Sequence, residues 1–372
     1  MACKSVVLFF LFQITTVFSS EETAAFSRSL HFTTRENKQL KGYVVKRFDS
    51  PSLLSCDQQC MRNAWCTSTN YKMSSKKGGK GTCELNKHDI SLINENANFH
   101  DQQGATFSML LTPCDVNPCM NGGTCYPAEG KYDFKCACAS AFSGKTCAKA
   151  YKSCAELFDA GFTEDGVYQI LSDKSEIINI YCDQSSWGGG WTMVFKLVSG
   201  VSADIYQLWT SADSLNENKT EALNVNSSFK GHYKNHFVQN WQTANPKEAR
   251  VALYNINDSK AEILSLVFNA TKSSKLNWFS RDRLTHSPWP DLYTGRIRGF
   301  DLQGCCGRNF YIFRRQGGCP NDYGWLVVTS NNCAWETRFP SRTVLYSNRT
   351  TVIHWNEYGN VGRANTLLVY IR

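Results

Sequence analysis

The chain has 372 residues, of which 42% are hydrophobic and 19% charged, and its formal net charge is +8. This composition is typical of folded protein and excludes a disordered chain, and the length allows two or three domains. The modest positive charge favours polyanionic glycans or acidic proteins as partners, and the sequence has no Asp or Glu run that could template a cationic mineral surface.

The N-terminus has the pattern of a secretory signal peptide. Lys4 supplies a positive charge, an apolar run extends from Val6 to Val17, and Ser19 is a small residue suited to a cleavage site. We expect cleavage near Ser19 or Ser20, so that residues 1–20 are removed. The alternative is an uncleaved anchor, which the short run and the lack of flanking charge disfavour. No later apolar run approaches the ~20 residues of a membrane helix, so we expect a secreted protein without a membrane span.

The cysteine content also indicates an oxidising compartment. The sequence has 17 cysteines, and once Cys3 leaves with the signal peptide an even number remains for full pairing. Nucleic acid is an implausible partner for such a chain. N-x-S/T sequons predict a glycoprotein with N-linked glycans at Asn218, Asn226, Asn257, Asn269 and Asn348.

A first domain is expected over residues 21–113. Cys56 and Cys60 are four residues apart, which puts both thiols on one face of a helix over residues 53–61. Strand-like runs at 65–71 and 82–85 flank a Lys- and Gly-rich turn at 76–80. We interpret this turn as a solvated hairpin tip, with a polyanion-binding loop as the alternative.

A helix with two cysteines next to a hairpin with two more resembles the PAN/apple domain family. The resemblance implies the disulfides Cys56–Cys83 and Cys60–Cys66. It also implies binding of proteins or carbohydrates.

Six cysteines fall between Cys114 and Cys147, with Gly, Pro and Asn between them. Such a segment buries too little apolar surface to fold without disulfides. Its spacing, with Asn-Gly-Gly-Thr-Cys at 121–125, resembles an EGF-like module over residues 114–148. Spacing alone allows fifteen connectivities. The resemblance implies the disulfides Cys114–Cys125, Cys119–Cys136 and Cys138–Cys147.

This module is interpreted as a rigid spacer. Leu111-Thr112-Pro113 stand where calcium-binding members of the family carry acidic residues, so we expect no calcium here. The segment before Cys125 resembles an O-fucosylation acceptor, which makes Thr124 a candidate for that modification. The alternative is that Thr124 is simply a turn residue.

Residues 149–372 contain nine of the ten tryptophans, in short apolar segments separated by Gly, Asn and Ser. This pattern predicts one α+β domain with its own core. A helical start at 153–158 is followed by Cys182 and by Gly188-Gly189-Gly190-Trp191. This order resembles the start of fibrinogen C-terminal (fibrinogen-related) domains and their intelectin relatives, and it implies the disulfide Cys154–Cys182.

The later part of this region departs from that family. Asn332-Cys333-Ala334 resembles the surroundings of the family's late disulfide, but the expected D-x-D calcium motif is absent and Asn321-Asp322 is a poor substitute. The family's calcium site and its acetyl-group pocket are therefore not expected. The sequence predicts no bound metal and no cofactor.

Cys305 and Cys306 are adjacent in the sequence. A disulfide between neighbours forms a strained ring, so we expect each to bond elsewhere, with Cys319 and Cys333 as the available partners. The order of these pairs stays open, and cross-linking to another chain is the alternative.

The stretch 354–360 mixes aromatic rings with a carboxylate, an amide and an imidazole, as sugar-binding sites do. The ligand-binding candidates are His354, Trp355, Glu357 and Tyr358. The alternative is that the two aromatic residues belong to the core before a last strand at 366–370. A basic stretch could face an acidic partner or lie on solvated strand edges; its members are Arg296, Arg298, Arg308, Arg314 and Arg315.

No catalytic pattern emerges: the sequence has neither an H-E-x-x-H pair nor a G-x-S-x-G elbow, and we predict that it is not an enzyme. We expect a multidomain α+β protein with small disulfide-rich parts that recognises extracellular matrix proteins or glycans. The order of its modules also resembles that of a skeletal organic matrix protein of stony corals, which implies a role in biomineralization. The alternatives are a lectin-type defence protein and a secreted ligand of a cell-surface receptor.

Overall fold

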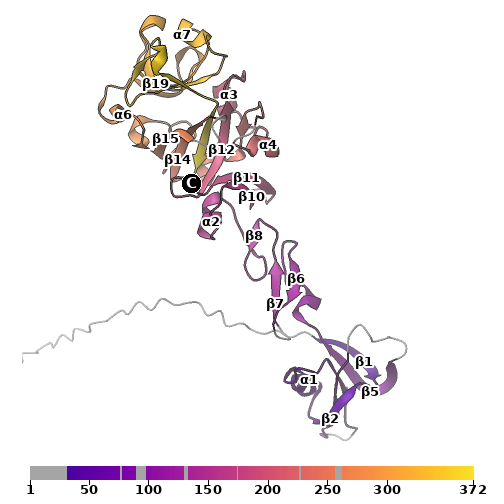
Figure 1. The fold of residues 1–372 in the computed structure, drawn as a ribbon. Coiled ribbons are helices and arrows are strands. Elements are labelled where there is room, and N and C mark those ends of the chain that lie inside the picture. The colour runs from indigo at the N-terminus through magenta and orange to yellow at the C-terminus, as the bar shows by residue number, and fades with distance from the viewer. Residues whose placement is uncertain are drawn as a thin grey trace, which may run out of the picture. The chain divides into compact units, whose positions relative to one another are not determined.

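The computed structural model describes residues 32–75, 78–88, 98–129, 133–173, 175–225, 228–255 and 262–372. The expected signal peptide, Lys76 and Lys77 of the Lys-rich turn, and the sequon residues Asn226 and Asn257 lie outside these ranges. The chain forms two compact units, whose elements are labelled in Figure 1. One unit extends to Pro118 and includes Tyr126–Phe134, and the other comprises Cys119–Cys125 and Lys135–Arg372.

A five-stranded antiparallel sheet with the order β1-β5-β3-β4-β2 forms the first unit. Its strands are β1 (Phe32–Leu40), β2 (Val44–Ser50), β3 (Ser68–Lys72), β4 (Gly81–Asn86) and β5 (Phe99–Leu110). Helix α1 (Leu53–Met61) begins after Ser52, whose hydroxyl accepts a hydrogen bond from the Ser55 amide at 3.1 Å. Two disulfides, Cys56–Cys83 and Cys60–Cys66, hold this helix against the sheet, and all four cysteines are fully buried.

The buried carboxylate of Glu84 lies on β4, between β3 and β2. It accepts hydrogen bonds from Asn70 Nδ2 (3.0 Å), Gln39 Nε2 (2.9 Å) and Arg47 Nε (2.8 Å). Burial alone would raise the pKa of Glu84, but these donors outweigh it and hold the pKa below its usual value.

Residues 113–150 form short elements. These are η2 (Pro113–Val116), β6 (Thr124–Pro127), β7 (Phe134–Ala137), β8 (Phe142–Ser143) and β9 (Lys149–Ala150). Disulfides join Cys119 to Cys136 and Cys138 to Cys147, and Cys114 and Cys125 are also disulfide-bonded. Apart from cysteine, Ala141 is the buried apolar residue in the described part of this segment. Its stability therefore rests largely on the disulfides.

The second unit contains an eight-stranded sheet, seven strands of which follow the order β10-β11-β12-β23-β14-β15-β16, with β13 beside β12. The strands are β10 (Gly166–Leu171), β11 (Ile177–Asp183), β12 (Trp191–Val198), β13 (Tyr233–Lys234), β14 (Glu248–Tyr254), β15 (Glu262–Asn269), β16 (Leu284–His286) and β23 (Thr366–Ile371). Figure 1 shows β12, β14 and β15 in this sheet, with the yellow strand β23 between β12 and β14. Strand β23 thus inserts into the middle of a sheet built from residues much earlier in the chain.

A six-stranded sheet completes this unit, with the order β17-β18-β19-β20-β22 and with β21 paired to β19. The strands are β17 (Gly299–Gln303), β18 (Asn309–Arg315), β19 (Tyr323–Val328), β20 (Val344–Ser347), β21 (Ile353–His354) and β22 (Val361–Ala364). The two sheets share one core, in which Val251 of β14, Ile312 of β18 and the indole of Trp278 are fully buried.

Helices in this unit are short. They are α2 (Cys154–Asp159), α3 (Ile205–Thr210), α4 (Thr220–Leu223), α5 (Trp241–Ala244), α6 (Asp291–Thr294), α7 (Ala334–Thr337), η3 (His236–Val238), η4 (Arg281–Arg283), η5 (Cys305–Gly307), η6 (Cys319–Asn321) and η7 (Tyr358–Asn360). The fold is therefore mostly β with few helices, where the sequence had indicated α+β. Within the described ranges, no helix is long and apolar enough to cross a membrane.

The Gly-Gly-Gly-Trp segment forms a turn that leads into β12. Gly188, Gly189 and Gly190 have φ angles of +84°, +74° and +77°. A Cβ atom on Gly189 would lie 2.3 Å from the ring of Phe158, so only glycine lets α2 pack here. The Cys154–Cys182 disulfide joins α2 to β11 beside this turn.

The late cysteines differ from the expectation. Cys319 is bonded to Cys333, while Cys305 and Cys306 are both free and exposed. The first pair forms because Cys319 opens η6 just before β19 and Cys333 precedes α7 just after it. Cys305 and Cys306 lie in a separate turn between β17 and β18, so the expectation that they bond to Cys319 and Cys333 is wrong.

Candidate recognition surface

Two rings stack across the neighbouring strands β19 and β21 of the six-stranded sheet. In the antiparallel pair β19–β21, Tyr323 is directly opposite His354. Their ring centroids are 4.5 Å apart and the ring planes differ by 16°. His354 Nε2 lies 2.7 Å from the carbonyl oxygen of Pro320 and must donate there, which fixes the tautomer of the imidazole.

Tyr358 is the most exposed aromatic residue of the candidate stretch, with 55% of its surface accessible. The guanidinium carbon of Arg338 lies 3.1 Å from the centre of its ring. Arg338 is fixed by two further bonds, from Nε to the Trp335 carbonyl (3.1 Å) and from Nη2 to the Trp355 carbonyl (3.3 Å). Burial lowers the pKa of Arg338, and the nearby Tyr358 opposes this effect.

Glu357 and Trp355 have opposite surroundings. Glu357 is exposed, and one of its carboxylate oxygens accepts a bond from Asn360 Nδ2 at 2.9 Å. Trp355 is fully buried and stacks on Trp335 at 5.4 Å, so it is a core residue and not a ligand platform. We refer to the remaining exposed or half-buried group, Tyr323, Arg338, His354, Glu357 and Tyr358, as the Tyr358 surface.

A buried ionic cluster lies beneath Trp355 and Trp335. The guanidinium of Arg308 lies 4.7 Å from the ring of Trp335, and Arg308 Nε bonds Glu336 Oε1 at 3.1 Å. Arg308 Nη2 is 3.2 Å from Asp322 Oδ2. Burial would lower the pKa of Arg308, but the bond to Glu336 and the two negative charges raise it. The arginine therefore keeps its charge inside the fold.

The carboxylate of Asp322, the poor substitute for the family's calcium motif, is part of this cluster. Asp322 is 1% exposed and is committed to Arg308 and to the Gly317 amide, which donates to it at 3.1 Å. In the part of the chain that the structure describes, no group of three or more His, Cys, Asp or Glu side chains could hold a metal ion. Arg308 is buried and does not belong to a basic surface, whereas Arg296, Arg298, Arg314 and Arg315 are exposed.

The candidate modification sites within the described ranges are accessible. Thr124 at the start of β6 is exposed, as are the sequon residues Asn218, Asn269 and Asn348. All three residues of the sequon Asn348-Arg349-Thr350 line an open groove of about 720 Å³, together with Trp289 and Tyr346. A glycan on Asn348 would lie over this groove.

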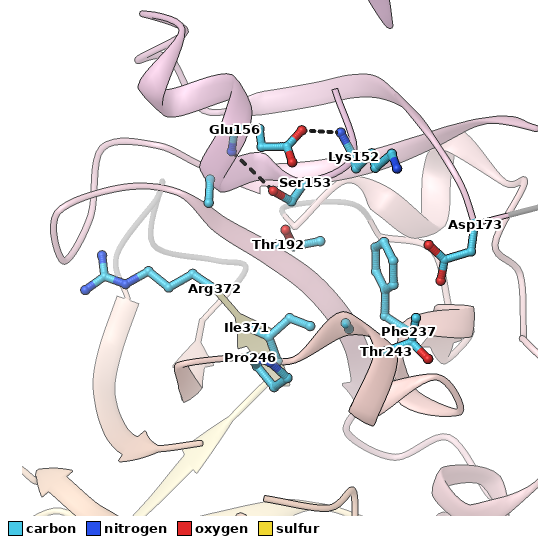
Figure 2. Close-up of a pocket in the computed structure, with 12 residues that line it drawn as sticks. Lys152, Ser153, Glu156, Asp173, Thr192, Phe237, Thr243, Pro246, Ile371 and Arg372 are labelled. Carbon is cyan, nitrogen blue, oxygen red and sulfur yellow. Dashed lines mark hydrogen bonds between the residues drawn. The ribbon is translucent and has the colours of Figure 1, made fainter. Parts of the chain in front are cut away.

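A smaller pocket of about 250 Å³ lies where α2 meets β12 and β23 (Figure 2). Several of its polar groups are already paired: the Lys152 amide donates to Glu156 Oε2 at 2.8 Å, and Ser153 Oγ accepts from the Glu156 amide at 3.2 Å. Arg372 at its rim is bound to Glu248. Lys152, Ser153, Glu156 and Arg372 thus spend these polar groups on bonds within the protein, whereas the ring of Tyr358 is exposed.

Sequence reasoning missed Tyr323 and Arg338. Tyr323 joins the surface through the register of β19 and β21, and Arg338 through the short helix α7. Neither residue lies near the stretch 354–358 in the sequence. The one available signal was the aromatic and basic content of the segments that follow Cys319 and Cys333.

Comparison with known families assigns two parts of the chain. Residues 29–109 match the PAN domain model, and residues 150–275 match the model of the fibrinogen beta and gamma chains, C-terminal globular domain. The chain contains a PAN domain and a fibrinogen C-terminal domain. The Tyr358 surface lies beyond the matched part of the fibrinogen C-terminal domain.

Curated relatives share short segments with this chain. Angiopoietin-2 of Canis lupus familiaris is 38% identical over 60 residues, which are 16% of this chain and 12% of that protein. The basement membrane-specific heparan sulfate proteoglycan core protein of Mus musculus is 39% identical over 56 residues, 15% of this chain and 2% of that protein. The versican core protein of Rattus norvegicus is 56% identical over 34 residues, 9% and 1% of the two chains. The chain thus matches only a small part of each relative.

Among solved structures, the fibrinogen-like globe domain of human ANGPTL6 aligns with 60% of this chain and 96% of its own. The identity is 16% and the TM-score is 0.34. The corresponding domain of human ANGPTL2 aligns over 60% of this chain with 11% identity and a TM-score of 0.28.

Proposed function

We propose that this protein is a secreted, non-catalytic recognition protein of the extracellular matrix, and that the Tyr358 surface binds glycans. The observation that carries this proposal is the exposed ring of Tyr358, held by Arg338 and flanked by the carboxylate of Glu357. A fixed aromatic face packs on the C–H face of a sugar, while carboxylate and imidazole groups bond its hydroxyls. Acidic matrix proteins are the other class of ligand that the cationic side chain and the net charge would accept.

The test is a glycan array probed with the full mature chain and with Tyr358→Ala. We expect the variant to lose at least about tenfold in apparent affinity, since one buried aromatic contact contributes roughly 1–3 kcal/mol. Tyr293→Ala is the matched control, because that ring is 46% exposed and lies outside the Tyr358 surface. Binding to no glycan, or equal loss in both variants, would overturn the proposal.

Binding should not depend on calcium. The carboxylates of Asp322 and Glu336 are paired with Arg308 and are therefore not free to bind a cation. We therefore expect the same array profile in calcium and in a chelator. A profile that disappears in the chelator would show that a metal ion takes part.

A location in the organic matrix of a calcified skeleton fits the module order that the sequence resembles. Similarity to two proteoglycan core proteins, one named as basement membrane-specific, supports a matrix location in general. Since the sequence has no acidic run, the protein would organise other matrix molecules and not nucleate mineral. Its peptides should be recovered from demineralised matrix, and their absence there would rule out this location.

The smaller assignments share this extracellular setting. We propose an EGF-like module over residues 114–148, cleavage of the signal peptide near residue 20, O-fucose on Thr124 and N-glycans on the sequons. The compact disulfide-bonded elements of residues 113–150 support the module, and the exposure of Thr124, Asn218, Asn269 and Asn348 supports the modifications. Glycopeptide mass spectrometry of the secreted protein tests the modifications directly.

A secreted ligand of a cell-surface receptor is the second candidate function. The similarity to angiopoietin-2 over 60 residues fits a secreted ligand as well as a recognition protein. Saturable binding to intact cells that persists after enzymatic removal of surface glycans would favour this candidate. A lectin-type defence protein would instead bind microbial glycans on the array.

A further inference from the structure

The turn between β17 and β18 holds two adjacent free cysteines. The Sγ atoms of Cys305 and Cys306 lie 3.1 Å apart, and both side chains are exposed. The other fourteen cysteines of the described chain are disulfide-bonded. Two exposed thiols in such a chain do not persist in an oxidising compartment. Each of the two sulfurs must therefore become part of a disulfide bond.

The backbone holds these two sulfurs together. Cys306 has φ +61° and ψ +27°, a left-handed conformation that destabilises a non-glycine residue by roughly 1–2 kcal/mol. The turn is fixed from outside by Asn332, whose side-chain amide donates to the Cys306 carbonyl, and by Arg342 Nη1, which donates to the Gly307 carbonyl at 2.7 Å. Residues that their surroundings hold in a strained backbone conformation are concentrated at functional sites.

We propose that Cys305 and Cys306 form a disulfide with each other, by exchange with a protein or low-molecular-weight disulfide of the secretory pathway. One thiolate attacks the oxidant and forms a mixed disulfide, and the second thiolate then attacks the first sulfur. Both S–H bonds are lost, one S–S bond forms in the chain, and the oxidant leaves as two thiols. This assignment goes beyond the recognition function and does not depend on it.

Two effects compete in this ring. An eight-membered ring that contains a peptide bond is strained, which was the reason to expect bonds elsewhere. In the folded chain, however, Cys319 and Cys333 are bonded to each other and are not available. The two sulfurs are already in contact, and groups held at such a distance have effective concentrations far above that of any second copy. Proximity therefore favours the internal bond, and strain makes it easier to reduce than the other disulfides.

The surroundings also determine how the exchange depends on pH. Burial and the hydrogen bond with Cys306 raise the pKa of Cys305 to about 11. Little Cys305 thiolate is then present at neutral pH, so this sulfur attacks any oxidant slowly there. Exchange at this pair should become faster as the pH rises toward 11.

The test uses the full chain secreted from eukaryotic cells, alkylated with N-ethylmaleimide under denaturing, non-reducing conditions and digested with trypsin. Arg298 and Arg308 bound a peptide, Gly299–Arg308, that contains both cysteines and no others. We expect this peptide without any alkyl group and with a mass two hydrogens below that of the dithiol. In a dithiothreitol titration it should become reduced before the remaining disulfide-linked peptides.

The other outcomes contradict the proposal. A peptide with two alkyl groups shows free thiols, and a peptide linked to a second copy of itself or to another cysteine peptide shows that the bond lies elsewhere. Cys305→Ser is the control variant, since it leaves Cys306 without its neighbour. Its peptide should carry one alkyl group or a small-molecule thiol, which shows that the reagent reaches this turn.

Discussion

At the scale of single residues, Arg308 carries the positive charge that neutralises two buried carboxylates. Replacing it with methionine removes the partner of Asp322 and Glu336 while roughly preserving side-chain length. We expect Arg308→Met to lower the free energy of unfolding by about 3–5 kcal/mol, because unpaired carboxylates are left in the protein interior. Denaturant unfolding followed by tryptophan fluorescence measures the change.

Arg314→Met is the matched control for this variant. Arg314 lies near Arg308 in the sequence, on β18, but its side chain is exposed. Its loss should change the unfolding free energy by no more than about 0.5 kcal/mol. Similar effects of the two substitutions would mean that the buried cluster does not stabilise the domain.

Lys196 makes the free energy of unfolding of the second unit depend on pH in the alkaline range. Its side chain is 1% exposed, its Nζ donates to the Asn224 carbonyl at 3.0 Å, and burial lowers its pKa from 10.5 to about 8. Below pH 8 both the folded and the unfolded chain carry the proton, and the folded state bears the full penalty of a buried charge. Between pH 8 and about 10 the folded state releases its proton first, so the free energy of unfolding should rise.

Thermal unfolding at pH 7.5 and 9.5 tests this prediction. Lys196→Met has no charge to bury, so the rise should shrink by on the order of 1 kcal/mol relative to the wild type. Lys234, whose pKa is also lowered to about 8, retains its own share of the rise. The exposed Lys230→Met should behave as the wild type. An unchanged rise in Lys196→Met would show that this lysine is not its source.

Residue roles within the 354–358 stretch could not be assigned from the sequence. Trp355 and Tyr358 are both aromatic and three positions apart, yet Trp355 is 0% and Tyr358 55% exposed. The difference arises because Trp335 of α7 stacks on the ring of Trp355, whereas the ring of Tyr358 lies against the guanidinium of Arg338 and stays exposed. These contacts are made by Trp335 and Arg338, and no local sequence pattern links either residue to the stretch 354–358.

At the scale of elements, β19 passes so close to its neighbours that one position must be glycine. A Cβ atom on Gly324 would lie 2.7 Å from the Ile312 carbonyl oxygen and 3.0 Å from the Trp355 ring. We expect Gly324→Ala to destabilise the domain by about 1–3 kcal/mol through overpacking. The melting temperature measured by circular dichroism reports the loss.

Gly359→Ala provides the comparison. A Cβ atom on Gly359 meets nothing within 4 Å, although this residue lies next to Tyr358. Its substitution should leave the melting temperature nearly unchanged. If Gly324→Ala were as stable as Gly359→Ala, the inference that β18 and Trp355 leave no room for a Cβ atom at residue 324 would be wrong.

Elements that carry their own signal could be predicted. The helix expected over 53–61 is confirmed, since the four-residue spacing of Cys56 and Cys60 and the start at Ser52 determine α1 locally. The turn at Gly188–Gly190 could likewise be predicted from its consecutive glycines. The pairing of Cys319 with Cys333 and the register of β21 were not, because they depend on how β19 is placed within its sheet.

At the scale of the whole molecule, the two compact units should unfold separately. Each has its own core, with Cys56, Cys60 and Leu85 buried in the first and the large tryptophan-rich cluster in the second. Calorimetry should therefore resolve two transitions. Removal of the Cys56–Cys83 disulfide in the double alanine variant should lower one of them, by about 2–4 kcal/mol in unfolding free energy.

The reciprocal variant tests which transition belongs to which unit. Cys154→Ala with Cys182→Ala removes the disulfide between α2 and β11 and should shift the other transition. A single transition that both double variants move together would mean that the chain folds as one cooperative body.

The central position of β23 constrains how the second unit can form during translation. β12 and β14 leave the ribosome long before β23, and each then exposes an edge of unpaired amides and carbonyls that β23 later bonds. Most of the eight-stranded sheet is therefore synthesised before its middle exists. These two edges have to stay available until residues 366–371 arrive, whereas both cysteines of the Cys154–Cys182 bond are synthesised well before that moment.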